Sequence, residues 1–193
     1  MTNYRKDGNA AEKVLLVDVD STIPNIALMR LSTYYKSLGW IVDVMHLGIS
    51  IYDRPKAIEI DNSEYDLTFV SAIFKGTIDN VLLKNPLSTD IGGTGTDNLS
   101  KKLPKEVEDC ECDYSIYPDC DTSVGFISRG CIRNCEFCIV REKEGSLRQV
   151  ANISDIVKHK KVKFLDNNFL ALPNHEELLQ ELIDKKIRCQ FNQ

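Results

Sequence analysis

The chain has 193 residues, of which 42% are hydrophobic and 27% charged, enough to form one large or two small domains with a buried core. The formal net charge is −5 and Lys and Arg form no block, which argues against a broad nucleic-acid-binding surface. There is no run of about 18 apolar residues, and residues 1–13 are polar and lack the apolar core of a signal peptide. We therefore expect no membrane span and a cytoplasmic protein whose seven cysteines are reduced.

The N-terminal part of the chain alternates strand and helix patterns. Residues 14–19 form a nearly continuous apolar run, typical of a buried parallel strand. Residues 25–38 carry apolar side chains at helical spacing, and Gly39 fits the position after a helix end. Further strand patterns cover residues 41–45, 66–74 and 81–83, while residues 57–60 fit a short helix or a strand edge. This order predicts an α/β fold, a Rossmann-like open parallel sheet, as a domain over residues 1–95.

Residues 96–122 are polar and rich in charges, which predicts a linker to a second domain over residues 123–193. In that domain, strand patterns cover residues 124–128, 162–166 and 187–191, and helix patterns cover residues 153–157 and 175–185. Asn174 is a natural N-cap for the last helix. The pattern is that of the first two and a half βα units of a barrel, so we expect the barrel to be partial.

Three cysteines stand close together directly after the first of these strands. Cys131, Cys135 and Cys138 have the spacing Cys-x3-Cys-x2-Cys. Three thiolates at this spacing can ligate three irons of a 4Fe–4S cluster, leaving the fourth iron open to a small molecule. Structural zinc is the alternative, but it requires four ligands, and no second Cys or His pair follows the motif.

The cysteine run, with Phe137 directly before the last cysteine, resembles the cluster motif of the radical S-adenosylmethionine superfamily. The resemblance implies a partial radical S-adenosylmethionine barrel, with a 4Fe–4S cluster and S-adenosylmethionine as cofactors. It also implies reductive cleavage of S-adenosylmethionine to a 5′-deoxyadenosyl radical, with electrons from a reductase or a flavodoxin-type donor. The substrate is not identified by these residues.

The same resemblance implies roles for residues around the cysteines. Gly130 would let the backbone approach the cluster, and Phe137 would pack near the adenine of S-adenosylmethionine. Asp166, Asn167 and Asn168 replace the Gly-Gly-Glu-like motif that binds the amino group of S-adenosylmethionine in the family. The alternative for these three residues is an ordinary Asx turn.

The upstream half also resembles a group of radical S-adenosylmethionine proteins with a cobalamin-binding-like N-terminal domain. The matching segments are residues 17–20, 24–29, 92–95, 103–104 and 113–118, together with 129–131 and 143–145 beside the cysteines. The cobalt-ligating Asp-x-His-x-x-Gly motif is absent, so we expect no cobalamin. Methylthiotransferase-like modification is one option for the reaction. Another is that the chain stops within the barrel and is an inactive iron–sulfur-binding protein.

A different class of function is suggested by the end of the first strand. Asp18 and Asp20, followed by Thr22, fit the Asp-x-Asp-x-Thr pattern of haloacid-dehalogenase-like phosphatases, in which the two carboxylates act as nucleophile and general acid. The simpler reading is that they cap the next helix. Cys110, Cys112 and Cys120 form a further group in the predicted linker. Their spacing matches no strong signature, so we interpret them as incidental thiols, with an auxiliary cluster or zinc site as the alternative.

Overall fold

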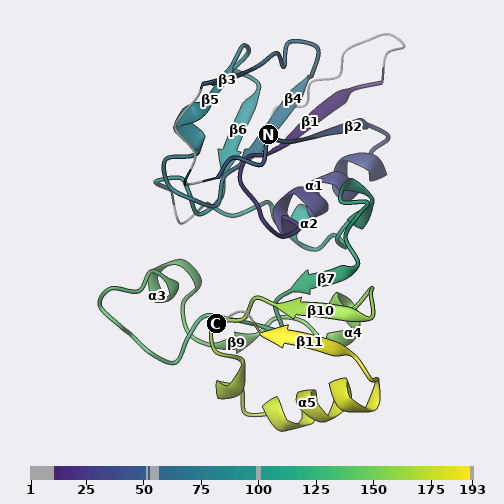
Figure 1. Cartoon of the computed structure of the whole chain (residues 1–193), viewed down its shortest axis with the longest axis vertical. Coiled ribbons are helices and arrows are strands. Elements are labelled where there is room, and N and C mark those ends of the chain that lie inside the picture. The colour runs from purple at the N-terminus through teal and green to yellow at the C-terminus, as the bar shows by residue number, and fades with distance from the viewer. Residues whose placement is uncertain (1–10, 51, 53–56, 99–100, 192–193) are drawn as a thin grey trace. The chain divides into compact units, whose positions relative to one another are not determined.

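A computed structural model shows a mixed α/β protein whose sheets are mostly parallel (Figure 1). The structure describes residues 11–50, 52, 57–98 and 101–191. The chain divides into two compact units, the first ending at Ile116 and the second beginning at Tyr117. The α/β fold expected from the sequence is confirmed at this level. In the described part, no helix is long and apolar enough to cross a membrane.

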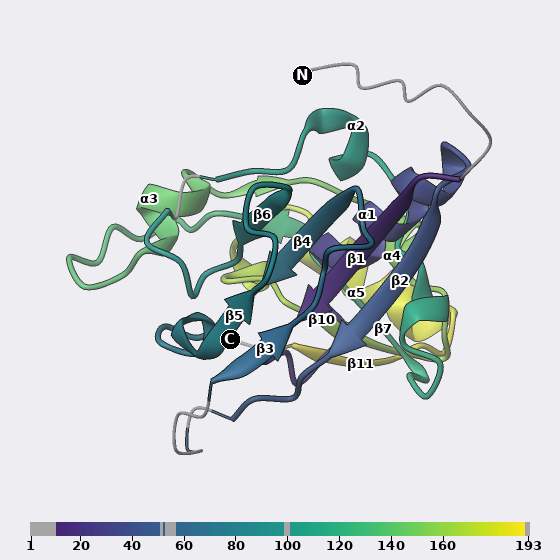
Figure 2. The same cartoon turned by 90° about the horizontal axis from the view of Figure 1, so that it is seen from above.

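The first unit contains a four-stranded parallel sheet in the order β2-β1-β4-β6 and a separate parallel pair, β3-β5 (Figure 2). The strands are β1 (Lys13–Asp18), β2 (Ile41–His46), β3 (Ile58–Ile60), β4 (Leu67–Ser71), β5 (Val81–Leu83) and β6 (Thr89–Gly92). The helical segments are α1 (Ile26–Ser37), η1 (Ile78–Asn80), α2 (Lys105–Glu108) and η2 (Tyr114–Ile116). Because the four strands are parallel, their carboxyl ends lie at one edge of the sheet.

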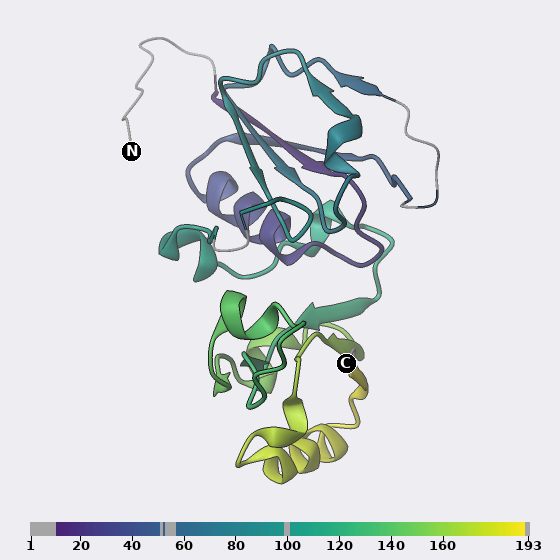
Figure 3. The same cartoon turned by 90° about the vertical axis from the view of Figure 1, so that its left-hand side faces the viewer.

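The apolar run of β1 is explained by burial on both faces of the sheet. Leu15 and Val17 share a core cluster with residues of β3 and β5, while Val14 and Leu16 alternate to the other face, against which α1 packs (Figure 3). The side chain of Asn25 accepts hydrogen bonds from two backbone N–H groups and so caps the start of α1.

Two strands of the first unit differ from the sequence prediction. The strand expected over residues 66–74 is limited to Leu67–Ser71, because the chain then turns away to form a loop held by Asp20. Strand β6, Thr89–Gly92, was not predicted, since its sequence Thr-Asp-Ile-Gly has only one large apolar side chain. It pairs with β4 and forms an edge of the sheet.

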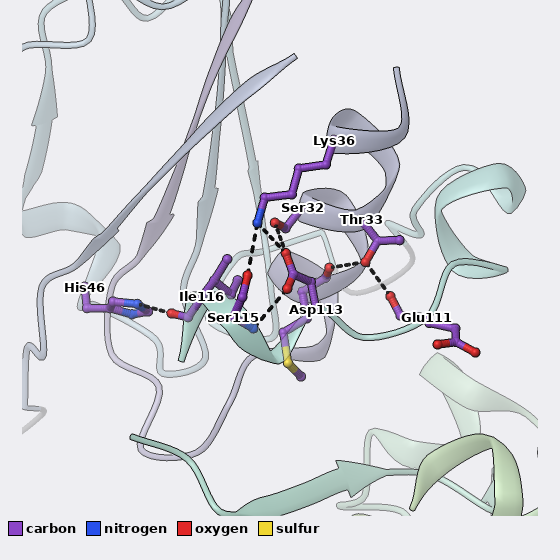
Figure 4. A network of polar contacts seen from close by, with 9 residues as sticks. Ser32, Thr33, Lys36, His46, Glu111, Asp113, Ser115 and Ile116 are labelled. Atoms are coloured by element: carbon purple, nitrogen blue, oxygen red, sulfur yellow. Dashed lines mark hydrogen bonds and ion pairs between the residues drawn. The ribbon is translucent and has the colours of Figure 1, made fainter. Parts of the chain in front are cut away.

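Part of the predicted linker is folded onto α1. Asp113 accepts hydrogen bonds from the Ser32 hydroxyl (2.7 Å), the Lys36 ammonium (2.6 Å) and the backbone N–H of Ser115 (2.9 Å) (Figure 4). Burial alone would raise the pKa of Asp113, but these hydrogen bonds lower it to about 2. His46 adds a hydrogen bond from Nε2 to the carbonyl of Ile116 (3.0 Å).

The second unit contains a three-stranded parallel sheet in the order β11-β10-β7 and a short antiparallel pair, β8-β9. The strands are β7 (Thr122–Gly125), β8 (Ser128–Arg129), β9 (Arg148–Gln149), β10 (Lys161–Phe164) and β11 (Arg188–Phe191). The helical segments are α3 (Val140–Glu144), α4 (Ile153–Ile156), η3 (Phe169–Ala171) and α5 (His175–Asp184). The single strand expected over residues 124–128 is therefore divided between β7 and β8.

The core of the second unit lies between the parallel sheet and its helices. Its buried members are Ile127, Ile153, Ile156, Val162, Phe164, Phe169, Leu172, Leu178 and Leu182. Helix α5 contributes Leu178 and Leu182 to this core, whereas Ile183 on the same helix is 66% exposed. Asn174 occupies the N-cap position without capping α5, and its amide donates to the side chain of Gln149 instead.

Candidate functional site

The three motif cysteines lie in the second unit, on one loop that begins after β8 and ends at β9. The same loop also contains the short helix α3. The two short strands pair Ser128 with Gln149 and Arg129 with Arg148, which closes the loop at its base. The backbone N–H of Cys131 donates to the carbonyl of Gly145 (3.3 Å), directly inside this base. The sequence prediction that the cysteines follow a strand therefore agrees with the structure.

Gly130 is required where the loop begins. Its φ of +81° lies in the left-handed region, and a Cβ built there would lie 2.3 Å from the carbonyl oxygen of Ser146. The close approach is thus between two segments of the loop itself. The expected approach of this glycine to a cluster stays a prediction.

The sulfur of Cys131 is surrounded by hydrogen-bond donors. The backbone N–H of Arg133 points to Cys131 Sγ at 3.4 Å, and the side-chain amide of Asn168 lies 3.6 Å from the same atom. The Arg133 N–H lowers the pKa of this thiol most, and the Asn168 amide adds to the effect, although partial burial opposes it. The sulfur of Cys131 thus has two donors that would stabilise a thiolate, the form that binds metal.

The rest of the loop faces solvent. Cys135 is half-buried, Cys138 is exposed, and Phe137 is 92% exposed. Ile132, also on the loop, is 63% exposed. Both apolar side chains are therefore available to cover a bound group.

The donor atoms of the loop suit an iron–sulfur cluster, although they are not yet gathered around one point. All three motif cysteines are free, and cysteine sulfur is the usual ligand of iron–sulfur clusters, so the chemistry of the donors fits. Among the residues that the structure describes, no three His, Cys, Asp or Glu side chains are gathered as for a metal ion. The three thiols would therefore have to be drawn together on binding, as is common for sites formed by metal.

Asp166, after β10, serves the fold of the loop that precedes the cysteines. It is 1% exposed, and its carboxylate accepts hydrogen bonds from the backbone N–H of Ile127 (3.1 Å) and from the backbone and hydroxyl of Ser128 (2.6 Å from Oγ). Burial raises the pKa of Asp166, while the bonds from Ser128 and Ile127 counteract that rise.

Asn167 and Asn168 extend toward the cysteine loop. The amide of Asn167 donates to Glu144 Oε2 (2.8 Å), and the amide of Asn168 lies against Cys131 Sγ. The structure thus brings two of the three residues predicted after β10 to the cysteine loop, at the carboxyl edge of the parallel sheet. Their proposed contact with S-adenosylmethionine stays a prediction.

Glu144 was noted in the sequence only as part of the segment 143–145, without a role of its own. Its side chain is 11% exposed and accepts from Arg129 Nη1 (2.8 Å), from the backbone N–H of Gly130 (3.0 Å) and from Asn167. The local sequence gives no sign of its contacts, because a glutamate that follows other charged residues at the end of a short helix has the pattern of a solvated side chain. Only the tertiary fold brings its partners together.

The carboxylates at the end of β1 are buried and form internal hydrogen bonds. Asp20 is 3% exposed and accepts from the backbone N–H groups of Ile73 (2.7 Å) and Phe74 (2.9 Å) and from the hydroxyl of Thr77 (2.5 Å). Asp18 is equally buried, and its carboxylate lies 3.5 Å from Nδ1 of His46. Asp20 therefore organises the loop after β4, which does not favour its use as a general acid in a phosphatase.

The remaining group of cysteines is divided between the units. Cys110 and Cys112 belong to the first unit, and Cys120 belongs to the second. The thiols of Cys110 and Cys120 donate to the backbone carbonyls of Glu106 (3.2 Å) and Thr122 (3.1 Å), respectively. Each of these two thiols thus makes a local contact with the backbone of its own unit.

Comparison with protein-family models, with curated proteins and with solved structures finds no match for this chain.

Proposed function

We propose that the chain is a radical S-adenosylmethionine protein whose loop between β8 and β9 binds a 4Fe–4S cluster through Cys131, Cys135 and Cys138. The observation that carries the proposal is the Cys-x3-Cys-x2-Cys spacing of three free thiols on one loop. The loop reaches the carboxyl edge of a parallel sheet, where ligands bind in α/β proteins.

The arrangement of the strands supports the finer fold that this function implies. In the second unit, β7, β10 and β11 are neighbours in chain order and parallel, with α4 and α5 between them, as in successive βα units of a barrel. In the first unit, the order β2-β1-β4-β6 with α1 between β1 and β2 is consistent with a Rossmann-like sheet.

The residues of the loop have separate parts in the proposed site. When bound and reduced, the cluster supplies the electron that cleaves S-adenosylmethionine at its sulfonium. The three thiolates hold iron, and donors from Arg133 and Asn168 stabilise the charge on the sulfur of Cys131. Phe137 is free to cover the adenine.

The loop after β10 is the candidate for binding the amino group of S-adenosylmethionine. Both oxygens of Asp166 accept hydrogen bonds inside the protein, so its carboxylate is committed to positioning Ile127 and Ser128. Asn167 and Asn168 stand closer to the cysteine loop, and their amide oxygens are suitable acceptors for an ammonium group. We therefore assign this role to the two asparagines rather than to Asp166.

The proposal is tested by anaerobic reconstitution with iron and sulfide, followed by iron and sulfide analysis and absorption spectroscopy. The wild-type protein is expected to bind four irons and four sulfides in the manner of a 4Fe–4S cluster. Alanine variants of Cys131, Cys135 or Cys138 should lose the cluster. Cys189→Ala is the matched control, because Cys189 is an exposed thiol on β11 outside the motif. Equal loss of iron in the control would count against the assignment of the ligands.

A further inference from the structure

Glu144 is unusual for its position in the chain. It is the last residue of the short helix α3, where a negative charge gains nothing from the helix dipole. Its side chain is nevertheless 11% exposed and accepts three hydrogen bonds, from Arg129, Gly130 and Asn167. A conflict between local preference and tertiary structure of this kind points to a role for the side chain.

Two of the donors to Glu144 are chain neighbours of residues that meet at the sulfur of Cys131. Gly130, whose N–H donates to Glu144 Oε2, directly precedes Cys131. Asn167, whose amide donates to the same oxygen, directly precedes Asn168, and the amide of Asn168 lies 3.6 Å from Cys131 Sγ. One carboxylate oxygen therefore holds both the backbone that carries the sulfur and the turn that donates to it.

We propose that Glu144 is a positioning residue for the iron–sulfur site, fixing Cys131 against the amide of Asn168. The inference rests on the proposed function and adds to it a residue outside the cysteine motif. Glu144 itself touches neither the sulfur nor, in this account, the cluster. It acts by holding two segments that are distant in sequence, the start of the cysteine loop and the turn after β10.

Two variants separate the charge of Glu144 from its shape. In Glu144→Gln, one oxygen becomes an NH₂ group, which must face a donor, either Arg129 or the pair formed by Gly130 and Asn167. In Glu144→Ala, all three donors lose their acceptor. Glu142→Ala is the matched control, since Glu142 is an exposed glutamate on the same helix.

The first measurement is hydrogen exchange of the full-length apoprotein, followed peptide by peptide. Glu144→Ala is expected to speed exchange of the amides of Gly130 and Cys131 by about tenfold or more, because their anchor is lost. Amides of β10 should exchange as in the wild type, which shows that the unit stays folded. The control Glu142→Ala should match the wild type throughout. Unchanged exchange at Gly130 in Glu144→Ala would overturn the proposal.

The second measurement is the midpoint potential of the reconstituted cluster. Donors to a cluster sulfur favour the reduced, more negative state, so a displaced Asn168 should shift the potential to more negative values. We expect this shift in Glu144→Ala and a smaller one in Glu144→Gln. If the alanine variant takes up too little iron for the measurement, the potential of the glutamine variant decides. Faster exchange with an unchanged potential would mean that Glu144 supports the loop without positioning the sulfur, and would overturn the proposal.

The two experiments keep this inference distinct from the proposed function. If the wild-type protein takes up no cluster, the proposed function fails. Exchange in the apoprotein would still decide whether Glu144 holds the start of the cysteine loop. If the wild type binds the cluster and Glu144→Ala matches it in exchange and potential, only the role of Glu144 fails.

Discussion

The two units place reactive side chains after strands in contrasting ways. At the end of β1, Asp20 is 3% exposed and its oxygens accept hydrogen bonds from three groups of the loop after β4. In the loop after β8, Cys138 and Phe137 are exposed, and Cys131 is held by donors to its sulfur. The first set of groups stabilises a loop, whereas the second remains available to a ligand.

This contrast shows why a motif alone does not identify a site. Asp18 and Asp20 match a phosphatase pattern in spacing, yet both carboxylate oxygens of Asp20 accept hydrogen bonds from the loop after β4. The cysteines match a cluster pattern in spacing, and their thiols are free. If the contrast is right, substitutions at the end of β1 will cost stability, and substitutions in the cysteine loop will cost metal binding.

The largest effect on stability is expected for Asp20→Ala. Removing the carboxylate leaves the backbone N–H groups of Ile73 and Phe74 without their acceptor, while the Thr77 hydroxyl keeps only its bond to the carbonyl of Phe74. These losses should lower the free energy of unfolding by about 2–3 kcal/mol. Urea titration followed by the fluorescence of Trp40, the single tryptophan, measures this in the first unit.

Asp79→Ala provides the control for Asp20→Ala, because Asp79 is an exposed carboxylate in the same unit. Its free energy of unfolding should stay within about 0.5 kcal/mol of the wild type. Iron uptake by Asp20→Ala should be unchanged. If the free energy of unfolding of Asp20→Ala equals that of the wild type, the carboxylate is not needed for the fold. The contrast between the two units would then be wrong.

The next largest effect is a pH dependence carried by Asp113. Its pKa in the folded protein is about 2, below the usual value of 3.8, so the stabilisation is complete above pH 4 to 5 and is lost as the pH falls toward 2. Asp113→Asn should therefore cost about 1–2 kcal/mol at pH 7 and progressively less at acid pH, allowing for partial solvent screening. Urea titrations at pH 7 and pH 3 measure the difference. An equal cost at both values would show that the charge of Asp113 is unimportant.

The smallest effect on stability is expected for Cys138→Ala in the apoprotein. The thiol is exposed, so the free energy of unfolding should change by less than about 0.5 kcal/mol. Far-UV circular dichroism during urea titration measures this, and iron analysis of the same variant should show that the cluster is lost. A loss of stability above about 1 kcal/mol would indicate a structural thiol and weaken the contrast.

The strongly patterned elements were predictable from the sequence. The apolar run at residues 14–19 corresponds to β1, because a strand buried on both faces is apolar at nearly every position. The helical spacing at residues 25–38 corresponds to α1, because a helix buried on one face repeats its apolar side chains every three to four residues. Strand β6 was missed because its pairing with β4, rather than its own side chains, makes it a strand. Similarly, Asp113 draws residues from the predicted linker onto α1 through contacts that no local pattern reveals.

Of the candidate site, only the proposed cysteine ligands could be predicted from the sequence. The spacing of Cys131, Cys135 and Cys138 is local and visible in the sequence, but the parts played by Glu144 and Asp166 depend on the fold. Asp166 was expected to bind a cofactor, and the structure places its carboxylate on the backbone of residues 127 and 128. Tertiary hydrogen bonds of this kind join segments far apart in the chain, so spacing rules cannot foresee them.

The most direct test of the central claim is the electron paramagnetic resonance spectrum of the reconstituted, reduced protein with and without S-adenosylmethionine. An open iron predicts a 4Fe–4S signal whose shape changes when S-adenosylmethionine is added and which is absent from Cys135→Ala. A cluster signal that is indifferent to S-adenosylmethionine would contradict the proposed activity, and a folded protein without any cluster would contradict the assignment of the cysteines as ligands.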